Sequence, residues 1–174
     1  MKDKINDIER RRKECGQHSI TIDKKGNLML EGGPETKKCG LYWIHTSYSL
    51  DELCKSTISQ KSNAVDIHKL ANLRNGLMKV IKQNTKGDFW IVYNGIGGSG
   101  LESDCSYGLR ERILQEFRDN EKTGSLKIRG TSLSDLTKWK YSYVVLEPSE
   151  YNELKTILEK CWRLEYGWPI LSNQ

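Results

Sequence analysis

Four polar side chains of the sequence lie at the ends or on the faces of predicted strands and helices. Tyr42 lies in one strand, Tyr93 ends a second, Arg112 lies on a helix, and Glu159 interrupts the apolar stripe of a later helix. Phosphodiester hydrolysis needs a base for the attacking water, a cation for the phosphate and a carboxylate for a divalent metal ion. Tyrosine, arginine and glutamate can supply these three groups, in that order.

Each of these residues also has an ordinary structural interpretation. A strand tyrosine usually packs its ring and leaves its hydroxyl in water. Arg112 has Glu116 four residues later, at the spacing of an ion pair on a helix. A helical glutamate is usually solvated, and Glu165 competes with Glu159 for the role of the carboxylate. The four residues are therefore informative through their order along the chain rather than one at a time.

A glycine-rich stretch offers a second kind of chemistry. Gly95, Gly97 and Gly100 match G-x-G-x-x-G directly after a predicted strand, and such a loop can surround a phosphate with backbone N–H groups. A dinucleotide site also needs a helix that opens inside the loop and an acid at the end of the next strand. Here the helix starts only near Gly108 and the next strand ends without an acid, so the pattern favours a plain glycine-rich loop.

The elements that must position these side chains are strands mixed with helices. Short runs of β-formers between turn residues indicate strands, and apolar residues three or four apart indicate helices. We expect strands at residues 19–22, 28–30, 39–46, 88–93, 126–129 and 140–146, a helical turn at 50–54, and helices at 2–15, 64–84, 109–118 and 148–166. Ser149 is the expected N-cap of the last helix. The mixture predicts a small mixed α/β domain.

Five short motifs occur in a fixed order along the chain. They are Gly40-Leu-Tyr42, Tyr93-Asn-Gly95, Leu109 to Arg112 on a helix, Glu159 on a later helix, and Pro169 to Asn173 at the end. This ordered set resembles the GIY-YIG nuclease superfamily, in which a G-x-Y strand pairs with a Y-x-G strand ahead of an arginine helix and a glutamate helix. The resemblance covers about residues 38–174. It implies an α+β fold with a small central mixed or antiparallel sheet flanked by helices.

The resemblance also implies a role for each motif residue. Tyr93 would act as, or near, the general base for the attacking water, and Tyr42 would be its companion. Arg112 would grip the scissile phosphate and stabilise its developing charge. Glu159 would be the sole protein ligand of one Mg²⁺ or Mn²⁺. Asn173 would be the closing asparagine, structural or in contact with the nucleic acid.

The sequence departs from the family pattern in several places. A predicted helix at residues 64–84 separates the two tyrosine motifs, and the stretch 95–108 lengthens the step to the arginine, as in the restriction-enzyme branch. Ile96 replaces a lysine or small polar residue, and Glu116 replaces a histidine or tyrosine. Residues that could substitute are Lys127, Lys138, Tyr107 and His45. Strand alternation puts His45 on the face opposite Tyr42.

Recognition of a nucleic acid would fall to the parts added to this core. We expect an N-terminal helix and hairpin extension at residues 1–37, and a nuclease-like domain at 38–174 with an insertion at 47–87. Arg10, Arg11 and Arg12 form a basic run that could contact phosphates without reading bases. The same run could equally be a solvated helix face balanced by neighbouring glutamates. A palindromic target would require a homodimer or two binding events.

Length, charge and cysteine content limit the alternatives. The 174 residues suit one domain, and a net charge of +5 permits a polyanionic partner without demanding one. Five scattered cysteines argue against a disulfide framework or a zinc knuckle, and they favour a reduced, cytoplasmic location. The sequence has no secretory signal and no apolar run of membrane-spanning length.

The sequence as a whole predicts a metal-dependent endonuclease acting on double-stranded DNA, most like a type II restriction enzyme of the GIY-YIG type. Two alternatives stay open. One is a repair, phage or intron-type nuclease of the same family with low specificity. The other is a non-catalytic nucleic-acid-binding module that keeps the fold.

Overall fold

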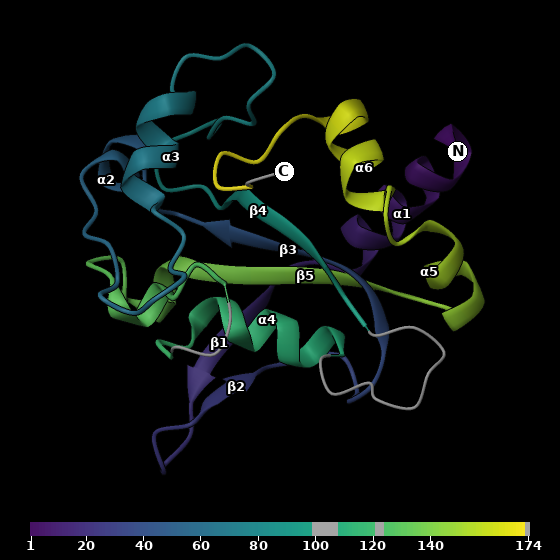
Figure 1. Cartoon of the computed structure of the whole chain (residues 1–174), viewed down its shortest axis with the longest axis horizontal. Helices are drawn as coiled ribbons and strands as arrows, with labels where there is room; N and C mark the ends of the chain where they lie inside the picture. Colours follow the sequence, from purple (N-terminus) through teal and green to yellow (C-terminus); the bar gives the residue numbers. More distant parts are fainter. Residues whose placement is uncertain (99–107, 121–123, 173–174) are drawn as a thin grey trace.

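The computed structural model describes residues 1–98, 108–120 and 124–172. Within those residues the chain forms a five-stranded antiparallel sheet in the order β2-β1-β5-β3-β4, which helices flank on both faces (Figure 1). The strands are β1 (His18–Ile22), β2 (Leu28–Leu30), β3 (Cys39–Thr46), β4 (Trp90–Gly97) and β5 (Trp139–Leu146). The predicted mixed α/β class with an antiparallel sheet is confirmed.

The central strand β3 sets the register of the candidate site. Every residue of β3 is buried, as expected for a strand covered on both faces. Tyr42 lies opposite Gly95 of β4 on one side and Tyr143 of β5 on the other. A register shift between Ile44 and His45 interrupts the pairing with β4. The G-x-Y and Y-x-G strands are therefore neighbours, as the sequence predicts.

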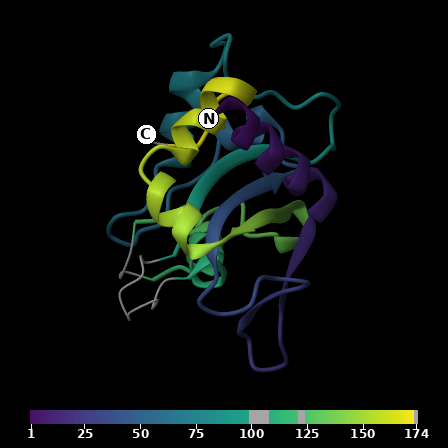
Figure 2. The ribbon, with the colours of Figure 1, turned by 90° about the vertical axis from the view of Figure 1, so that its right-hand side faces the viewer.

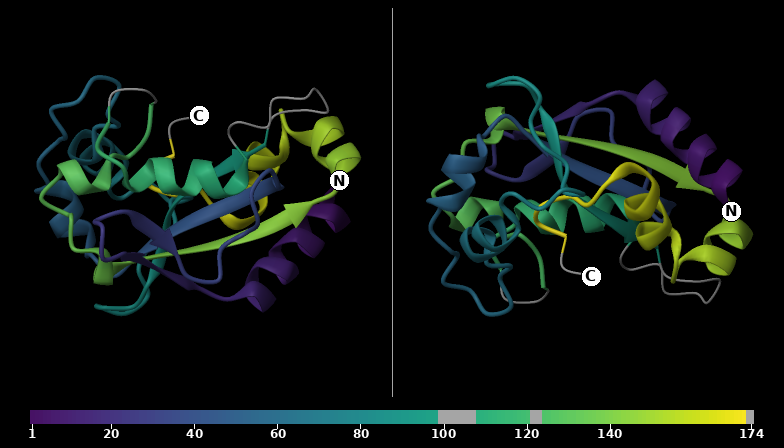
Figure 3. Two further views of the ribbon diagram at one scale, coloured as in Figure 1. Left: turned by 90° about the horizontal axis from the view of Figure 1, so that it is seen from below. Right: turned by 90° about the horizontal axis from the view of Figure 1, so that it is seen from above.

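The helices form two layers, one on each face of the sheet (Figure 3). Helix α4 (Leu109–Phe117) covers one face, together with buried residues of α2 (Leu50–Cys54) and α3 (Ile67–Arg74). Helices α1 (Lys2–Cys15), α5 (Pro148–Leu154) and α6 (Leu158–Tyr166) cover the other face. Strand alternation divides β3 between the two cores, because Tyr42 packs in the α4 layer and Trp43 packs in the α6 layer.

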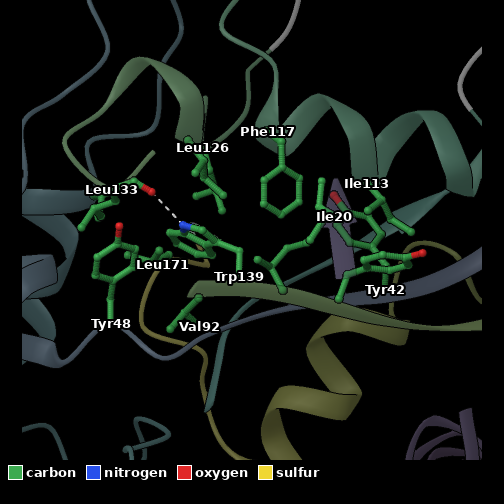
Figure 4. Packing of buried hydrophobic residues seen from close by; sticks show 14 of the residues in the cluster. Ile20, Tyr42, Tyr48, Val92, Ile113, Phe117, Leu126, Leu133, Trp139 and Leu171 are labelled. Carbon is green, nitrogen blue, oxygen red and sulfur yellow. Dashed lines mark hydrogen bonds between the residues drawn. The ribbon is translucent and has the colours of Figure 1, made fainter. Parts of the chain in front are cut away.

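The larger core lies between the sheet and α4. Trp139, Phe117 and Tyr42 are all fully buried there (Figure 4). The Trp139 indole N–H donates a 2.8 Å hydrogen bond to the carbonyl oxygen of Leu133, so the one polar atom of this large side chain is satisfied (Figure 4). This packing fixes α4, and with it Arg112, against the central strands.

The N-terminal segment packs onto the rest of the fold. Strand β1 pairs with β5, and Ile5 and Ile8 of α1 are buried in the core of the α6 layer. Helix α1 lies beside α6 (Figure 2). Ile20 and Leu30 are buried in the core of the α4 layer, so residues 1–37, the expected extension, share the sheet and both cores with residues 38–174.

The predicted helix at residues 64–84 is wrong in its second half. Helix α3 covers only Ile67–Arg74, and Gly76 follows in a left-handed conformation with φ of 84°. The apolar residues Val80 and Ile81 lie instead in an extended segment that pairs with Trp168. The helical spacing of Val80 and Ile81 relative to the apolar residues of α3 is therefore a coincidence, because α3 and the segment around Val80 pack separately.

Two further predictions need correction. Residues 126–129 are not a strand, because Lys127 is left-handed and a 3₁₀ turn at Ile128–Gly130 follows it. The last helix is two helices, α5 and α6, separated by residues 155–157. Helix α5 has Glu147 at its N-cap and Pro148 in the first turn, so Ser149 is not the cap.

The remaining predicted elements are confirmed within one to four residues at their ends. The main extension is β4, which continues to Gly97, so Gly95 and Gly97 lie in a strand rather than in the expected loop. Gly100 lies outside the described residues. Among the helices that the structure describes, none has both the length and the apolar character that crossing a membrane requires.

Candidate active site at the outer edge of strand β4

A polar cavity of about 490 Å³ lies beside β4. Tyr93, Arg112 and Glu159, three of the four residues singled out from the sequence, line it together. The remaining lining residues are Asn63, Ala64, Val65, Asp66, Gly124 and Arg163. Part of the insertion at residues 47–87 therefore forms one wall of the cavity.

Tyr42, the fourth residue, lies behind the cavity and is completely buried. Its ring lies 6.1 Å from the ring of Tyr93, measured between centroids. Gly95 makes room for it, because a Cβ atom at that position would lie 2.5 Å from the Tyr42 hydroxyl oxygen. Any side chain at position 95 would therefore collide with Tyr42, which explains the glycine of the Y-x-G motif in this fold.

Glu116 on α4 holds the hydroxyl of Tyr42. The hydroxyl donates a 2.6 Å hydrogen bond to Glu116 Oε1, and the backbone N–H of Leu126 donates a 2.9 Å hydrogen bond to Glu116 Oε2. Both side chains are fully buried. Burial raises the pKa of Glu116 and raises the pKa of Tyr42 well above 10, with the Glu116 charge adding to the latter shift. Glu116, which departs from the family pattern, is therefore a direct hydrogen-bond partner of Tyr42.

Arg112 reaches the cavity from the first turn of α4. Gly97 allows the helix to approach β4, because a Cβ atom there would lie 2.5 Å from the Cα of Leu109. Arg112 Nη1 donates a 2.8 Å hydrogen bond to Oε1 of Gln115. Tyr42 is the largest cause of a raised pKa for Arg112, so this guanidinium is a permanent cation in the site.

Tyr93 is the tyrosine that meets the cavity. Burial raises its pKa far above 10, and the charges of Glu116 and Glu159 act in the same direction. Arg112 opposes this shift. The resting state of Tyr93 is therefore the neutral phenol.

Glu159 crosses to the cavity from α6, on the other face of the sheet. Its carboxylate accepts a hydrogen bond from the backbone N–H of Ile96, on the outer edge of β4. Its side chain is 26% exposed, and burial raises its pKa, while Arg163 is the largest influence that lowers it. Glu159 is the carboxylate among the four predicted catalytic residues, and it is accessible from the cavity.

Arg163, which the sequence analysis missed, completes the site. Its Nη2 lies 3.1 Å from Glu159 Oε2, its Nε donates a 2.7 Å hydrogen bond to Oδ1 of Asn94, and only 2% of its side chain is exposed. Ser172 also donates to Asn94 Oδ1, over 3.1 Å. The E-x-x-x-R spacing of Glu159 and Arg163 is the signal that could have revealed the pair.

The basic run of α1 does not line the cavity. Arg12 is held by both carboxylate oxygens of Glu9, at 2.8 and 2.6 Å. Arg10 pairs with Asp7 and Glu14, and Arg11 donates to the backbone oxygen of Val145. Arg10 and Arg12 thus have the glutamate partners expected for a balanced helix face, whereas the acidic neighbour of Arg11 is Asp7, 3.8 Å away.

The other residues considered from the sequence fall elsewhere. His45 lies on the face opposite Tyr42, beside Arg12 and Gln17, and its Nε2 lies 2.8 Å from Oγ of Ser142. Glu165 pairs with Lys2 at the surface, so it does not compete with Glu159. Lys138 pairs with Glu52, and the fully buried Lys127 donates to the backbone of Asn120. Tyr107 and Asn173 lie outside the described residues.

The cavity therefore brings together a neutral phenol, two arginines and the carboxylates of Glu159 and Asp66, with a buried Tyr42–Glu116 pair behind them. Arginine N–H groups bind phosphate oxygens, and a carboxylate binds hard cations. Comparisons of the chain with protein-family models, curated proteins and solved structures found no match to any of them.

Proposed function

We propose that the protein is a metal-dependent DNA endonuclease of the GIY-YIG type, most like a type II restriction enzyme. The observation that carries the proposal is the meeting of Tyr93, Arg112 and Glu159 around one cavity, with Tyr42 directly behind it. These residues come from two strands and two helices that are far apart in sequence. A common site explains their meeting better than chance proximity does.

The residues present fit a hydrated divalent cation. Mg²⁺ is usually held by one or two carboxylates together with substrate phosphates, and it keeps several of its waters. Glu159 supplies one carboxylate in the cavity, and Asp66 lies in the cavity wall, where its Oδ1 accepts from the backbone N–H of Lys69. Among the described residues there is no cluster of three or more acidic, histidine or cysteine ligands. A cation here would therefore depend on Glu159 and on the phosphate itself.

The side chains would divide the hydrolysis among them. Arg112 would bind the scissile phosphate and stabilise the charge that develops on it. Tyr93, which lines the cavity, would orient the attacking water through its hydroxyl, and the proton that the water loses would be released to the surrounding solvent. Glu116 would hold the Tyr42 hydroxyl in a fixed direction beside Tyr93. The bound metal ion would supply Lewis-acid polarisation of the phosphate. Cleavage of this type leaves 5′-phosphate and 3′-hydroxyl ends.

Recognition of a specific DNA sequence would come from residues outside the five motifs. Residues 63–66 of the insertion form a wall of the cavity, so they are placed to contact nucleotides next to the scissile bond. A homodimer acting on a palindrome and a cytoplasmic location remain part of the proposal. Cys15, Cys54 and Cys161 are free thiols, in keeping with a reducing compartment.

The test is digestion of phage DNA by the purified protein with Mg²⁺ or Mn²⁺, and with EDTA as the blank. We expect discrete metal-dependent bands, and a loss of at least about a hundredfold in rate for Glu159→Gln and Arg112→Ala. Glu165→Gln is the matched control, because it removes an exposed carboxylate of the same helix. Wild-type cutting by Glu159→Gln or Arg112→Ala would refute the site, and a smear instead of bands would indicate a nuclease of low specificity.

One observation favours the second candidate, a non-catalytic nucleic-acid-binding module. Glu159 already forms an ion pair with Arg163, so its negative charge is compensated within the protein. A module of this kind would retard DNA in a gel at low salt, equally well with EDTA, and would leave the DNA intact after prolonged incubation with Mn²⁺.

A further inference from the structure

Arg163 is anchored more firmly than a typical partner of a helix ion pair. Its Nε and Nη2 donate to the side-chain and backbone oxygens of Asn94, at 2.7 and 3.2 Å. The guanidinium carbon also lies 5.2 Å from the centre of the Trp168 ring. Arg163 cannot turn into solvent without giving up these contacts, so its charge is a fixed part of the cavity wall.

This fixed charge acts on Glu159 in particular. Arg163 Nη2 lies 3.1 Å from Glu159 Oε2, so one oxygen of the carboxylate is engaged by a buried cation. The other buried amino group of the guanidinium, Nη1, has no hydrogen-bond partner among the described residues. A donor of this kind is poorly satisfied and is suited to an anion rather than to a second cation.

A divalent cation approaching Glu159 would meet opposition from two arginines. Arg112 and Arg163 both line the cavity, and Glu159 and Asp66 are the acidic residues in the described part of its lining. Two unit charges a few ångströms apart at a protein surface interact by several kcal/mol. The phosphate of a nucleic acid brings the negative charge that the cavity lacks, together with oxygen ligands for the metal.

We propose that Arg163 keeps the metal affinity of Glu159 low in the DNA-free protein, so that the divalent cation and the DNA backbone phosphate enter the site together. This inference rests on the proposed function, because it takes Glu159 as the metal ligand. By thermodynamic linkage, metal and DNA then raise each other's affinity by the same factor. Arg163 is thus a positioning residue that makes metal loading depend on the substrate.

The experiment measures Mn²⁺ binding directly, through the electron paramagnetic resonance signal of the free ion. In DNA-free protein we expect Arg163→Gln to bind Mn²⁺ on the order of tenfold to a hundredfold more tightly than wild type. Arg163→Lys keeps the charge and should stay close to wild type. Arg118→Gln is the matched control, since it removes an arginine paired with Glu111 outside the cavity. An Arg163→Gln variant that binds Mn²⁺ no more tightly than wild type would overturn the inference.

A second measurement needs no substitution of Arg163, whose loss could unfold the protein. The Mn²⁺ affinity of the wild type is compared with and without a short mixed-sequence DNA duplex, in parallel with Glu159→Gln. We expect the duplex to tighten Mn²⁺ binding by at least about tenfold in the wild type and not in the variant. No tightening in the wild type would refute the coupling alone. Equal tightening in Glu159→Gln would instead refute Glu159 as the ligand, and with it the proposed active site.

Discussion

Replacing His45 with glutamine should make the fold more tolerant of mild acid. The imidazole is 1% exposed, and its two nitrogens lie 2.8 Å from Ser142 Oγ and 3.4 Å from Gln17 Nε2. Since the Gln17 amide nitrogen donates, Nδ1 accepts and Nε2 carries the proton. Burial lowers the pKa of His45 from 6.5 to about 3, and the nearby charges of Arg12 and Lys140 act in the same direction.

The magnitude follows from the difference between folded and unfolded chains. At about pH 5 the unfolded imidazole is protonated roughly thirty times more often than it is neutral, whereas folded His45 stays neutral. Because the unfolded chain binds a proton at His45 below about pH 6.5 and the folded protein does not, the free energy of unfolding falls as the pH is lowered through this range. Linkage then removes about 2 kcal/mol between about pH 7.5 and about pH 5. This value depends little on the folded pKa, provided that it stays below about 4.

The assay is urea unfolding of the wild type and His45→Gln at both pH values. The wild type should lose about 2 kcal/mol more than the variant over this range. Glu116, whose raised pKa acts in the opposite direction, is present in both proteins, so its contribution cancels in the comparison. His68→Gln, at an exposed position of α3, is the matched control. Equal losses in wild type and His45→Gln would refute the description of His45 as a buried neutral group.

Three other substitutions test the site and its frame. Gly95→Ala places a methyl group 2.5 Å from the Tyr42 hydroxyl oxygen, so we expect a loss of about 1–3 kcal/mol in urea unfolding and a fall in any cutting activity. Tyr42→Phe removes the donor to buried Glu116, which should cost about 1–3 kcal/mol, and unchanged stability would show that the carboxyl is hydrated. Arg10→Gln breaks only exposed pairs, so DNA affinity at physiological salt should change less than about twofold, and a tenfold loss in a filter-binding assay would instead support the phosphate contact predicted from the sequence.

The sequence predicts the sheet well because its strands carry strong local signals. Cys39–Thr46 and Trp139–Leu146 are runs of β-formers with polar or glycine boundaries, and both are strands. The hairpin of β1 and β2 is also found, around the predicted turn. Local sequence patterns do not predict the order of the strands in the sheet, because pairing such as that of β1 with β5 joins residues more than a hundred positions apart.

The predicted long helix fails where local spacing and tertiary pairing disagree. Val80 and Ile81 lie at helical distance from Leu73 and Leu77, but Gly76 ends the helix between them. Val80 and Ile81 then pack beside Trp168, which is almost ninety residues later. No periodicity in a local window can reveal such a partner. The break between α5 and α6 is hidden for a similar reason, since neither glycine nor proline marks it.

The candidate site was predicted in its motif residues and missed in their partners. The residue types and order of Tyr93, Arg112 and Glu159 indicate a common site, and all three line one cavity. The roles of Glu116 and Arg163 depend on which side chains the fold brings within hydrogen-bond distance. The sequence indicates Glu116 as a possible ion-pair partner of Arg112 and as a departure from the family pattern, but it does not reveal the hydrogen bond with Tyr42.

The candidate site lies across the edge of a sheet whose two layers pack separately. Tyr42, Tyr93 and Arg112 belong to the α4 layer, whereas Glu159 and Arg163 belong to α6 on the opposite face. A chain in which only one layer has docked therefore has either Arg112 and the two tyrosines in place, or Glu159 and Arg163, but not both sets. The cavity with all of its polar lining residues therefore exists only after both helical layers have docked on the sheet.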